Sequence, residues 1–254
     1  MYMASNRRSF LKKATLSVFA ATLIPEIVSA AFEIENVKRI AIKEGSVILF
    51  QGDSITDSGR DKTSIEVNNS ISLGSGYPLL ATAALLNDQP EKRLTVYNRG
   101  ISGNKVYQLA SKWEEDCLNL KPDVLSILVG VNDFWHTISY DYKGSPKVYR
   151  DDLSALLEKT KQKLPDVKLI IGEPFAVSGV KIVVPNWFPS FNEYQQSAKE
   201  IAEKYNAVFI PYQRIFDEAQ KAAPGSYWTS DGIHPTLAGS MLMAKAWLKT
   251  IKKL

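Results

Sequence analysis

The sequence contains a single cysteine, Cys117, and only two histidines among its 254 residues. One cysteine cannot form a disulfide within the chain, which excludes a disulfide-stapled scaffold. Cys117 follows Trp113 in an amphipathic stretch, which predicts a packed core thiol rather than a nucleophile. The two histidines lack the spacing of metal ligands, and no cysteine cluster accompanies them, so we expect no metal site.

Nucleotide-binding signatures are also missing. Neither G-x-x-x-x-G-K-[ST] nor G-x-G-x-x-G occurs in the sequence, so we expect no cofactor. Hydrophobic residues make up 45% and charged residues 23%, which is typical of a globular chain and excludes a disordered or collagen-like one.

Positive charge is concentrated at the N-terminus. The formal net charge is +4, but residues 1–30 hold four basic residues and one acidic residue. The rest of the chain has 27 basic and 26 acidic residues. Because the folded body is nearly neutral, we expect no nucleic-acid partner.

Residues 1–30 predict an export signal. The pair Arg7-Arg8 precedes an apolar run over residues 14–24, and Val28-Ser29-Ala30 supplies small residues for cleavage. The arginine pair is typical of a twin-arginine signal, with a general Sec signal as the alternative. No segment is long and apolar enough for a stable membrane span. We therefore expect a periplasmic or extracellular protein, with residues 31–254 as a single domain.

Short apolar runs alternate with helical patterns from residue 45 onward. We expect strands over 46–50, 94–97, 124–129, 167–171 and 207–210. Helices are expected over 76–87, 105–120, 149–163 and 191–205, and from Pro235 onward. In the last helix, the expected buried stripe is Leu237, Met241, Ala244, Leu248 and Ile251. This alternation predicts an α/β fold, a three-layer αβα sandwich with a five-stranded parallel sheet.

Polar residues follow the strands at the edge where ligands bind in such folds. Ser54 follows the first strand on a loop that can expose its hydroxyl, and His234 can act as its base. Asp231 lies three residues before His234, so a local turn could aim its carboxylate at the ring. Taken singly, Ser54 could be a turn serine and Asp231 a helix-terminal acid.

Four segments carry a family resemblance: Gly52-Asp53-Ser54, Gly100-Ile101-Ser102-Gly103-Asn104, Gly130-Val131-Asn132-Asp133 and Asp231-Gly232-Ile233-His234. They resemble, in the same order, the sequence blocks of the SGNH branch of the GDSL hydrolases, and the resemblance covers about residues 45–254. It implies the flavodoxin-like SGNH hydrolase fold and serine esterase chemistry. By position, it implies Ser54, Asp231 and His234 as catalytic residues. It also implies an oxyanion hole made by the backbone N–H groups of Ser54 and Gly103 and the side-chain amide of Asn132.

Residues 45–136 look most like the intracellular bacterial acetylxylan esterases of this superfamily, a similarity that returns around residues 231–248. It implies an acetylated carbohydrate as the substrate, although the export signal departs from that subgroup. Candidate substrate contacts are Asp53, Trp135, His136 and Trp228. His136 is expected to line the pocket or lie on the surface rather than act as a base. A set of aromatic residues in predicted loops suggests a recognition surface, with core packing as the alternative for each: Phe134, Trp135, Tyr140, Tyr142, Trp187, Phe188, Tyr227 and Trp228.

Two other functions stay open on the sequence. A lysophospholipase or acyl thioesterase would use the same residues, and a non-catalytic carbohydrate-binding protein could keep the fold. The sequence also leaves open whether the chain forms a homo-oligomer.

Overall fold

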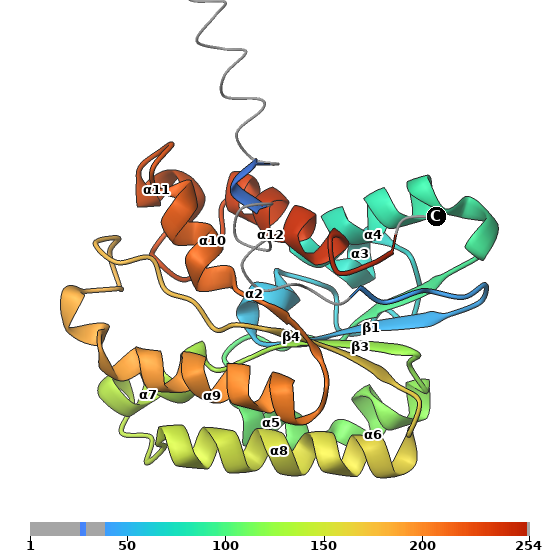
Figure 1. The fold of residues 1–254 in the computed structure, drawn as a ribbon, viewed down its shortest axis with the longest axis horizontal. Helices are drawn as coiled ribbons and strands as arrows, with labels where there is room; N and C mark the ends of the chain where they lie inside the picture. Colours follow the sequence, from blue (N-terminus) through green and yellow to red (C-terminus); the bar gives the residue numbers. More distant parts are fainter. Residues whose placement is uncertain (1–25, 29–38, 253–254) are drawn as a thin grey trace, which may run out of the picture.

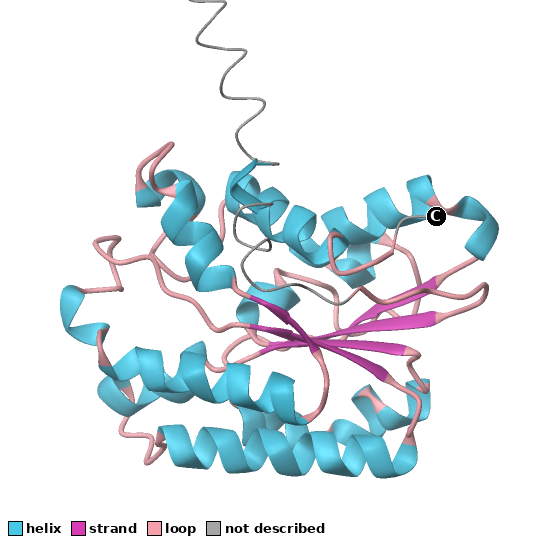
Figure 2. Ribbon diagram, viewed as in Figure 1, coloured by secondary structure: helices cyan, strands magenta, loops and turns pink. Residues whose placement is uncertain are grey.

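The computed structural model describes residues 26–28 and 39–252, so most of the predicted export signal lies outside the described residues. Five parallel strands form one sheet in the order β2-β1-β3-β4-β5. Helices cover both faces of this sheet (Figures 1 and 2). The predicted three-layer α/β fold is therefore confirmed.

All five expected strands are present. Their bounds are β1 (Val47–Gly52), β2 (Thr95–Asn98), β3 (Val124–Leu128), β4 (Lys168–Gly172) and β5 (Val208–Ile210). The central strand β3 is buried along its whole length, as expected where helices exclude water from both faces. The chain runs outward from β1 to β2 and then returns to β3 on the other side of β1. This reversal creates a topological switch point, and ligands in such sheets bind at the carboxyl ends of the strands there.

The helices divide into two layers (Figure 1). One layer holds α3 (Ser70–Leu73), α4 (Tyr77–Asp88), α10 (Tyr212–Ala219), α11 (Gly225–Trp228) and α12 (Leu237–Leu248), with the short α2 (Ser54–Asp57) beside the sheet. The other holds α5 (Val106–Ser111), α6 (Trp113–Asp116), α7 (Val131–Ser139), α8 (Pro146–Lys163) and α9 (Ser190–Lys204). Three 3₁₀ turns complete the described elements: η1 (Pro90–Lys92), η2 (Leu118–Leu120) and η3 (Pro185–Trp187).

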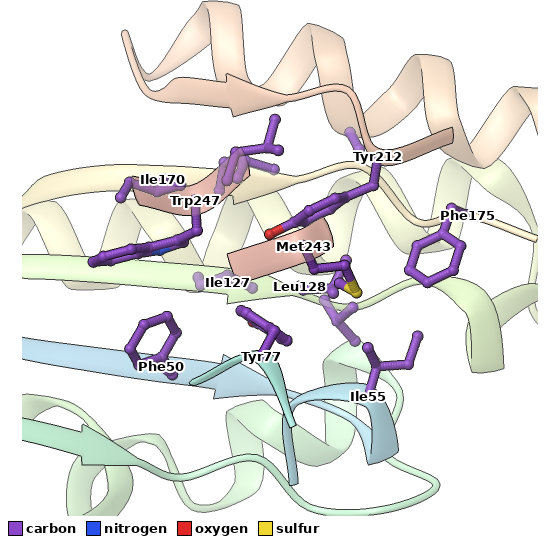
Figure 3. Packing of buried hydrophobic residues seen from close by; sticks show 14 of the residues in the cluster. Phe50, Ile55, Tyr77, Ile127, Leu128, Ile170, Phe175, Tyr212, Met243 and Trp247 are labelled. Atoms are coloured by element: carbon purple, nitrogen blue, oxygen red, sulfur yellow. The ribbon is translucent and has the colours of Figure 1, made fainter. Parts of the chain in front are cut away.

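An aromatic cluster joins the sheet to the first layer (Figure 3). Phe50 of β1 packs against Tyr77 and Trp247, with ring centroids 5.7 and 4.9 Å apart. The buried indole N–H of Trp247 donates to Ser126 Oγ at 3.0 Å. This bond satisfies a polar group inside the core, and it fixes α12 over β3.

The helix expected over 105–120 is broken into α5, α6 and η2. Its apolar repeat is real, because Leu109, Trp113 and Cys117 are all buried. The backbone leaves helical geometry at Lys112 and again at Cys117. These bends let Trp113 reach Thr160 of α8, to which its indole N–H donates at 2.8 Å. Tertiary packing has overridden a local helical pattern, and Cys117 is the packed thiol that was expected.

The last helix begins two residues later than expected, and its predicted stripe is partly wrong. Thr236 caps α12 by accepting the N–H of Gly239. Leu237 and Met241 are exposed, whereas Leu242, Met243, Ala246 and Trp247 are buried with Ala244. The helix packs on both the sheet and α4 (Figure 1), so its buried face is wider than one stripe. Over the described part of the chain, no helix is long and apolar enough to cross a membrane.

Candidate active site

Ser54 is the first residue of α2, directly after β1. Asp53 is the N-cap of this helix, and its Oδ1 accepts the N–H of Ile55 at 3.0 Å. An N-cap carboxylate satisfies a free N–H of the first helical turn. The sharp change from strand to helix therefore fixes Ser54 at the carboxyl edge of the sheet, where it is half-buried.

A chain of hydrogen bonds joins Ser54 to the segment before α12, 180 residues away in sequence. Ser54 Oγ lies 2.8 Å from His234 Nε2. On the other side of the ring, His234 Nδ1 lies 2.7 Å from Asp231 Oδ2. These distances allow the hydroxyl to donate to Nε2 while Nδ1–H donates to the carboxylate.

The Asp231–His234 turn is held by its own backbone. Asp231 Oδ1 accepts the N–H groups of Ile233 and His234 at 2.9 and 2.8 Å. Gly232, between Asp231 and Ile233, has a φ of +98°, and an added Cβ there would lie 2.6 Å from Val183 Cγ2. Only glycine suits this turn, which aims the carboxylate at the ring.

Asp231 keeps its charge in this setting. Burial acts to raise the pKa of Asp231, but the hydrogen bonds from His234 and the N–H of Ile233 outweigh burial and lower the pKa below its usual value. A charged carboxylate at Nδ1 holds the proton there, so Nε2 is left as an acceptor.

The three groups expected to form the oxyanion hole belong to Ser54 at the start of α2, to Gly103 in the segment after β2 and to Asn132 on α7. Within the described residues, the backbone N–H groups of Ser54 and Gly103 donate to no other group. Gly103 has a φ of +82°, a conformation that glycine adopts without strain. Asn132, on the first turn of α7, is buried, and its Nδ2 donates one hydrogen to Asn104 O at 3.2 Å. That bond orients the amide and leaves its second N–H available.

A supporting network that the sequence analysis missed ties these loops together. The buried Asn98, at the end of β2, donates to Thr56 O and Leu73 O at 2.7 and 2.8 Å and accepts the N–H of Gly100. Asp57 of α2 accepts the N–H and hydroxyl of Ser102 at 2.9 and 2.7 Å. The partners are up to 45 residues apart in sequence, so no local pattern could have revealed them.

The four candidate substrate contacts lie in different settings. Asp53 and Trp228 are buried, and the indole N–H of Trp228 donates to Ala219 O and Ala223 O. These are the positions of structural residues. Trp135 and His136 lie on α7 and are partly exposed.

The aromatic set also divides between core and surface. Phe134 and Trp187 are buried and pack on each other. Phe134 and Trp135 lie on a helix rather than in a loop. Tyr140 and Tyr227 are exposed, and Tyr142 and Phe188 are half-buried.

Two carboxyl groups are buried behind the site. Burial raises the pKa of both Asp53 and Asp133 to about 7. One oxygen of each accepts a backbone N–H, from Ile55 and Val106 respectively, while the other has no partner among the described residues. Each group therefore keeps its proton to a much higher pH than an exposed carboxyl group does.

Over residues 26–28 and 39–252, no cluster of three His, Cys, Asp or Glu side chains could hold a metal ion.

Comparison with known proteins places this arrangement in a family. A model of the GDSL-like lipase/acylhydrolase family matches residues 50–242. The chain belongs to this family. An acetylxylan esterase of Geobacillus stearothermophilus is 35% identical over 212 residues, which cover 83% of this chain and 95% of that enzyme. Family membership and this relative identify the chain as a carboxylic ester hydrolase.

Solved structures agree. A GDSL-like lipase from Parabacteroides merdae is 48% identical, with a TM-score of 0.82, over 84% of this chain and 98% of that one. The Geobacillus stearothermophilus acetylxylan esterase Axe2 is 32% identical, with a TM-score of 0.76, over 85% of this chain and 100% of that one. Solved structures of catalytic mutants of Axe2 replace a serine, an aspartate or a histidine, the last two lying three positions apart in that enzyme.

Proposed function

We propose that this protein is an exported serine esterase that removes O-acetyl groups from carbohydrates of the xylan type. The observation that carries the proposal is the hydrogen-bond chain from Ser54 Oγ through His234 to Asp231. Asp231 and His234 have the same spacing as the aspartate and histidine replaced in the catalytic mutants of Axe2. An acetylxylan esterase as a relative favours an acetyl ester as the bond that is cleaved.

In the first step, Ser54 Oγ attacks the carbonyl carbon of the acetyl group and its proton passes to His234 Nε2. Asp231 stabilises the resulting imidazolium ion and keeps the ring oriented. The negative oxygen that forms is bound by the N–H groups of Ser54 and Gly103 and by the Asn132 amide. These donors are fixed before the reaction, so no reorganisation is needed when charge develops.

In the second step, the bond between the acetyl carbon and the sugar oxygen breaks. His234 gives its proton to that oxygen, which leaves as a sugar hydroxyl. A water molecule then attacks the acetyl-enzyme with His234 again as base, and acetate and free Ser54 are released.

Two further parts of the proposal concern location and substrate recognition. Export rests on the arginine pair and apolar run of residues 1–30, and cell fractionation with N-terminal sequencing tests it. Recognition of a sugar is supported by partly exposed aromatic rings on and after α7, those of Trp135 and Tyr142. Such rings can pack on the apolar face of a pyranose.

The first experiment measures initial hydrolysis rates on 4-nitrophenyl acetate, butyrate and octanoate, and acetate release from acetylated xylo-oligosaccharides. We expect a strong preference for acetate that disappears in Ser54→Ala. Ser70→Ala, a serine at the start of α3, is the matched control and should retain activity.

Other outcomes would identify a different function. A preference for octanoate would favour a lysophospholipase or thioesterase over a deacetylase. Binding of acetylated oligosaccharide without any Ser54-dependent hydrolysis would favour a non-catalytic carbohydrate-binding protein.

A further inference from the structure

Three contacts join the segment after β2 to α7, one above the other. At the floor of the site, Asn132 Nδ2 donates to Asn104 O at 3.2 Å. Beside it, Asp133 Oδ1 accepts the N–H of Val106 at 3.2 Å. One turn further along α7, about 6 Å along the helix axis, His136 Nδ1 lies 3.0 Å from Lys105 Nζ. Lys105 therefore directly follows Asn104, whose carbonyl oxygen orients the proposed oxyanion donor Asn132.

Lys105 is a buried cation without an ion pair. Only 7% of the residue is exposed, and within the described chain no carboxylate oxygen lies within 4.0 Å of its ammonium group. Burial lowers the pKa of Lys105, an effect opposed by the charge of Asp133. Burying an unpaired charge is costly, so this position favours an anion supplied from outside the chain.

Two tyrosine rings surround the ammonium group. Lys105 Nζ lies 5.5 Å from the ring centroid of Tyr107 and 5.2 Å from that of Tyr142. The rings are stacked on each other, with centroids 5.9 Å apart. Cation–π contacts of this kind hold a lysine side chain in place while leaving its charge uncompensated. Tyr107 is about half exposed, so one aromatic surface beside the charge is open to a ligand.

The contact with Lys105 also determines the protonation of His136. An ammonium group can only donate hydrogen bonds, so Nδ1 must accept and the ring proton must lie on Nε2. Burial lowers the pKa of His136, and the charge of Lys105 lowers it further. His136 is therefore neutral and offers Nε2–H as a donor, which excludes it as a general base in this state.

We propose that the ammonium group of Lys105, positioned by His136, forms an anion-binding subsite that recognises the carboxylate of a uronic acid residue carried by the acetylated carbohydrate. This inference rests on the proposed function and adds a substrate feature to it. A single ammonium group matches a monoanion, and the exposed ring of Tyr107 suits a pyranose. The subsite lies one helical turn from Asn132, so the acid recognised belongs to the same saccharide chain as the acetyl ester.

The test compares kcat/KM on two acetylated xylo-oligosaccharides that differ only in one uronic acid branch. We expect the parent to prefer the acidic substrate by about 10-fold or more, since hydrogen bonds to charged groups have this strength. Lys105→Met should abolish the preference, mainly by raising KM for the acidic substrate, and Lys105→Arg should retain part of it. Lys112→Met is the control: it removes an exposed charge at the other end of α5, the helix that Lys105 precedes. It should leave the preference unchanged.

A spectroscopic measurement separates recognition from a purely structural role. Since the sequence has only two histidines, their ¹⁵N resonances can be assigned with single variants. His136 should be neutral with its proton on Nε2, and Lys105→Met should allow the other tautomer. Adding glucuronate should shift the His136 resonances of the parent and not those of Lys105→Met.

The two proposals fail in distinguishable ways. Ser54-dependent deacetylation with no preference for the acidic substrate, or with an equal preference in Lys105→Met, would overturn the subsite and leave the esterase standing. If no deacetylation occurs, calorimetric titration with the acidic oligosaccharide still tests the subsite, which requires tighter binding to the parent than to Lys105→Met. Lys105-dependent binding of a lysophospholipid in preference to the oligosaccharide would overturn the uronate assignment.

Discussion

At the scale of the residue, the carboxylate of Asp231 faces three N–H donors, and asparagine, which has the same shape, could serve only some of them. Its Oδ1 holds the turn by accepting two backbone N–H groups, while Oδ2 faces His234 Nδ1. An asparagine could keep the first function because its carbonyl oxygen still accepts. It would lose the second, because an amide N–H cannot accept from Nδ1–H.

We therefore expect Asp231→Asn to fold normally and to lose about 10³- to 10⁴-fold in kcat on 4-nitrophenyl acetate. The ring would place its proton on Nε2, where it can no longer accept from Ser54. Asp166→Asn is the control and should match the parent. Asp166 is exposed in the turn between α8 and β4. A loss below threefold in Asp231→Asn would show that His234 needs no carboxylate, and the mechanism above would be wrong.

At the scale of the element, the active site depends on how closely the loop after β2 approaches α2. An added Cβ at Gly100 would lie 2.5 Å from Asp57 N and 2.9 Å from Thr56 C, both backbone atoms of α2. Asn98 and Ser102 bind the same helix from either side of Gly100. The loop and the helix that carries Ser54 therefore cannot separate without breaking several hydrogen bonds.

Gly100→Ala should displace α2 and lower both stability and activity. We expect a loss of about 1–3 kcal/mol in the free energy of unfolding, the usual cost of overpacking, together with at least a 10-fold fall in kcat/KM, since small misplacements of reacting groups are costly. Urea unfolding and ester hydrolysis measure the two effects. Gly45→Ala tests a loss of stability without this clash: it strains the backbone, because Gly45 has a φ of +73°, but it meets open space around the added Cβ. It should lose stability without losing activity. Equal activities in the two variants would contradict the coupling between this loop and Ser54.

The elements also show what the sequence could and could not predict. Strands were predictable because continuous apolar runs such as that of β3 are demanded by a sheet covered on both faces. Ser54 was predicted from its place at the end of the first strand, and the roles of Asp231 and His234 from the family resemblance of the segment before the last helix. The break of the helix at Lys112 could not be predicted, since it accompanies a hydrogen bond from Trp113 to Thr160 of α8, 47 residues further along the chain. The contact of Lys105 with His136 was equally hidden, because 31 residues separate them.

At the scale of the whole molecule, the buried carboxyl groups make folding dependent on pH. Asp133 has its pKa raised to about 7 by burial, with the nearby charge of Asp53 adding to the effect and Lys105 opposing it. In the unfolded chain the pKa is near 3.8. Between these values the folded protein binds more protons than the unfolded one, so the free energy of unfolding falls as pH rises. The loss of folding stability caused by ionising the buried Asp133 is absent below about pH 4 and complete above about pH 7.

Asp133→Asn removes this titration while its carbonyl oxygen can still accept the N–H of Val106. One pKa unit corresponds to about 1.4 kcal/mol, so between pH 5 and pH 8 the variant should gain about 2–3 kcal/mol relative to the parent. Urea unfolding at the two pH values measures this difference, and Asp166→Asn should show no comparable change. If Asp133→Asn shifts the free energy of unfolding equally at pH 5 and pH 8, then Asp133 is ionised in the folded protein. Its charge would in that case be compensated within the site by Lys105, whose charge lowers the pKa of Asp133, and the ammonium group would be less available to a substrate carboxylate.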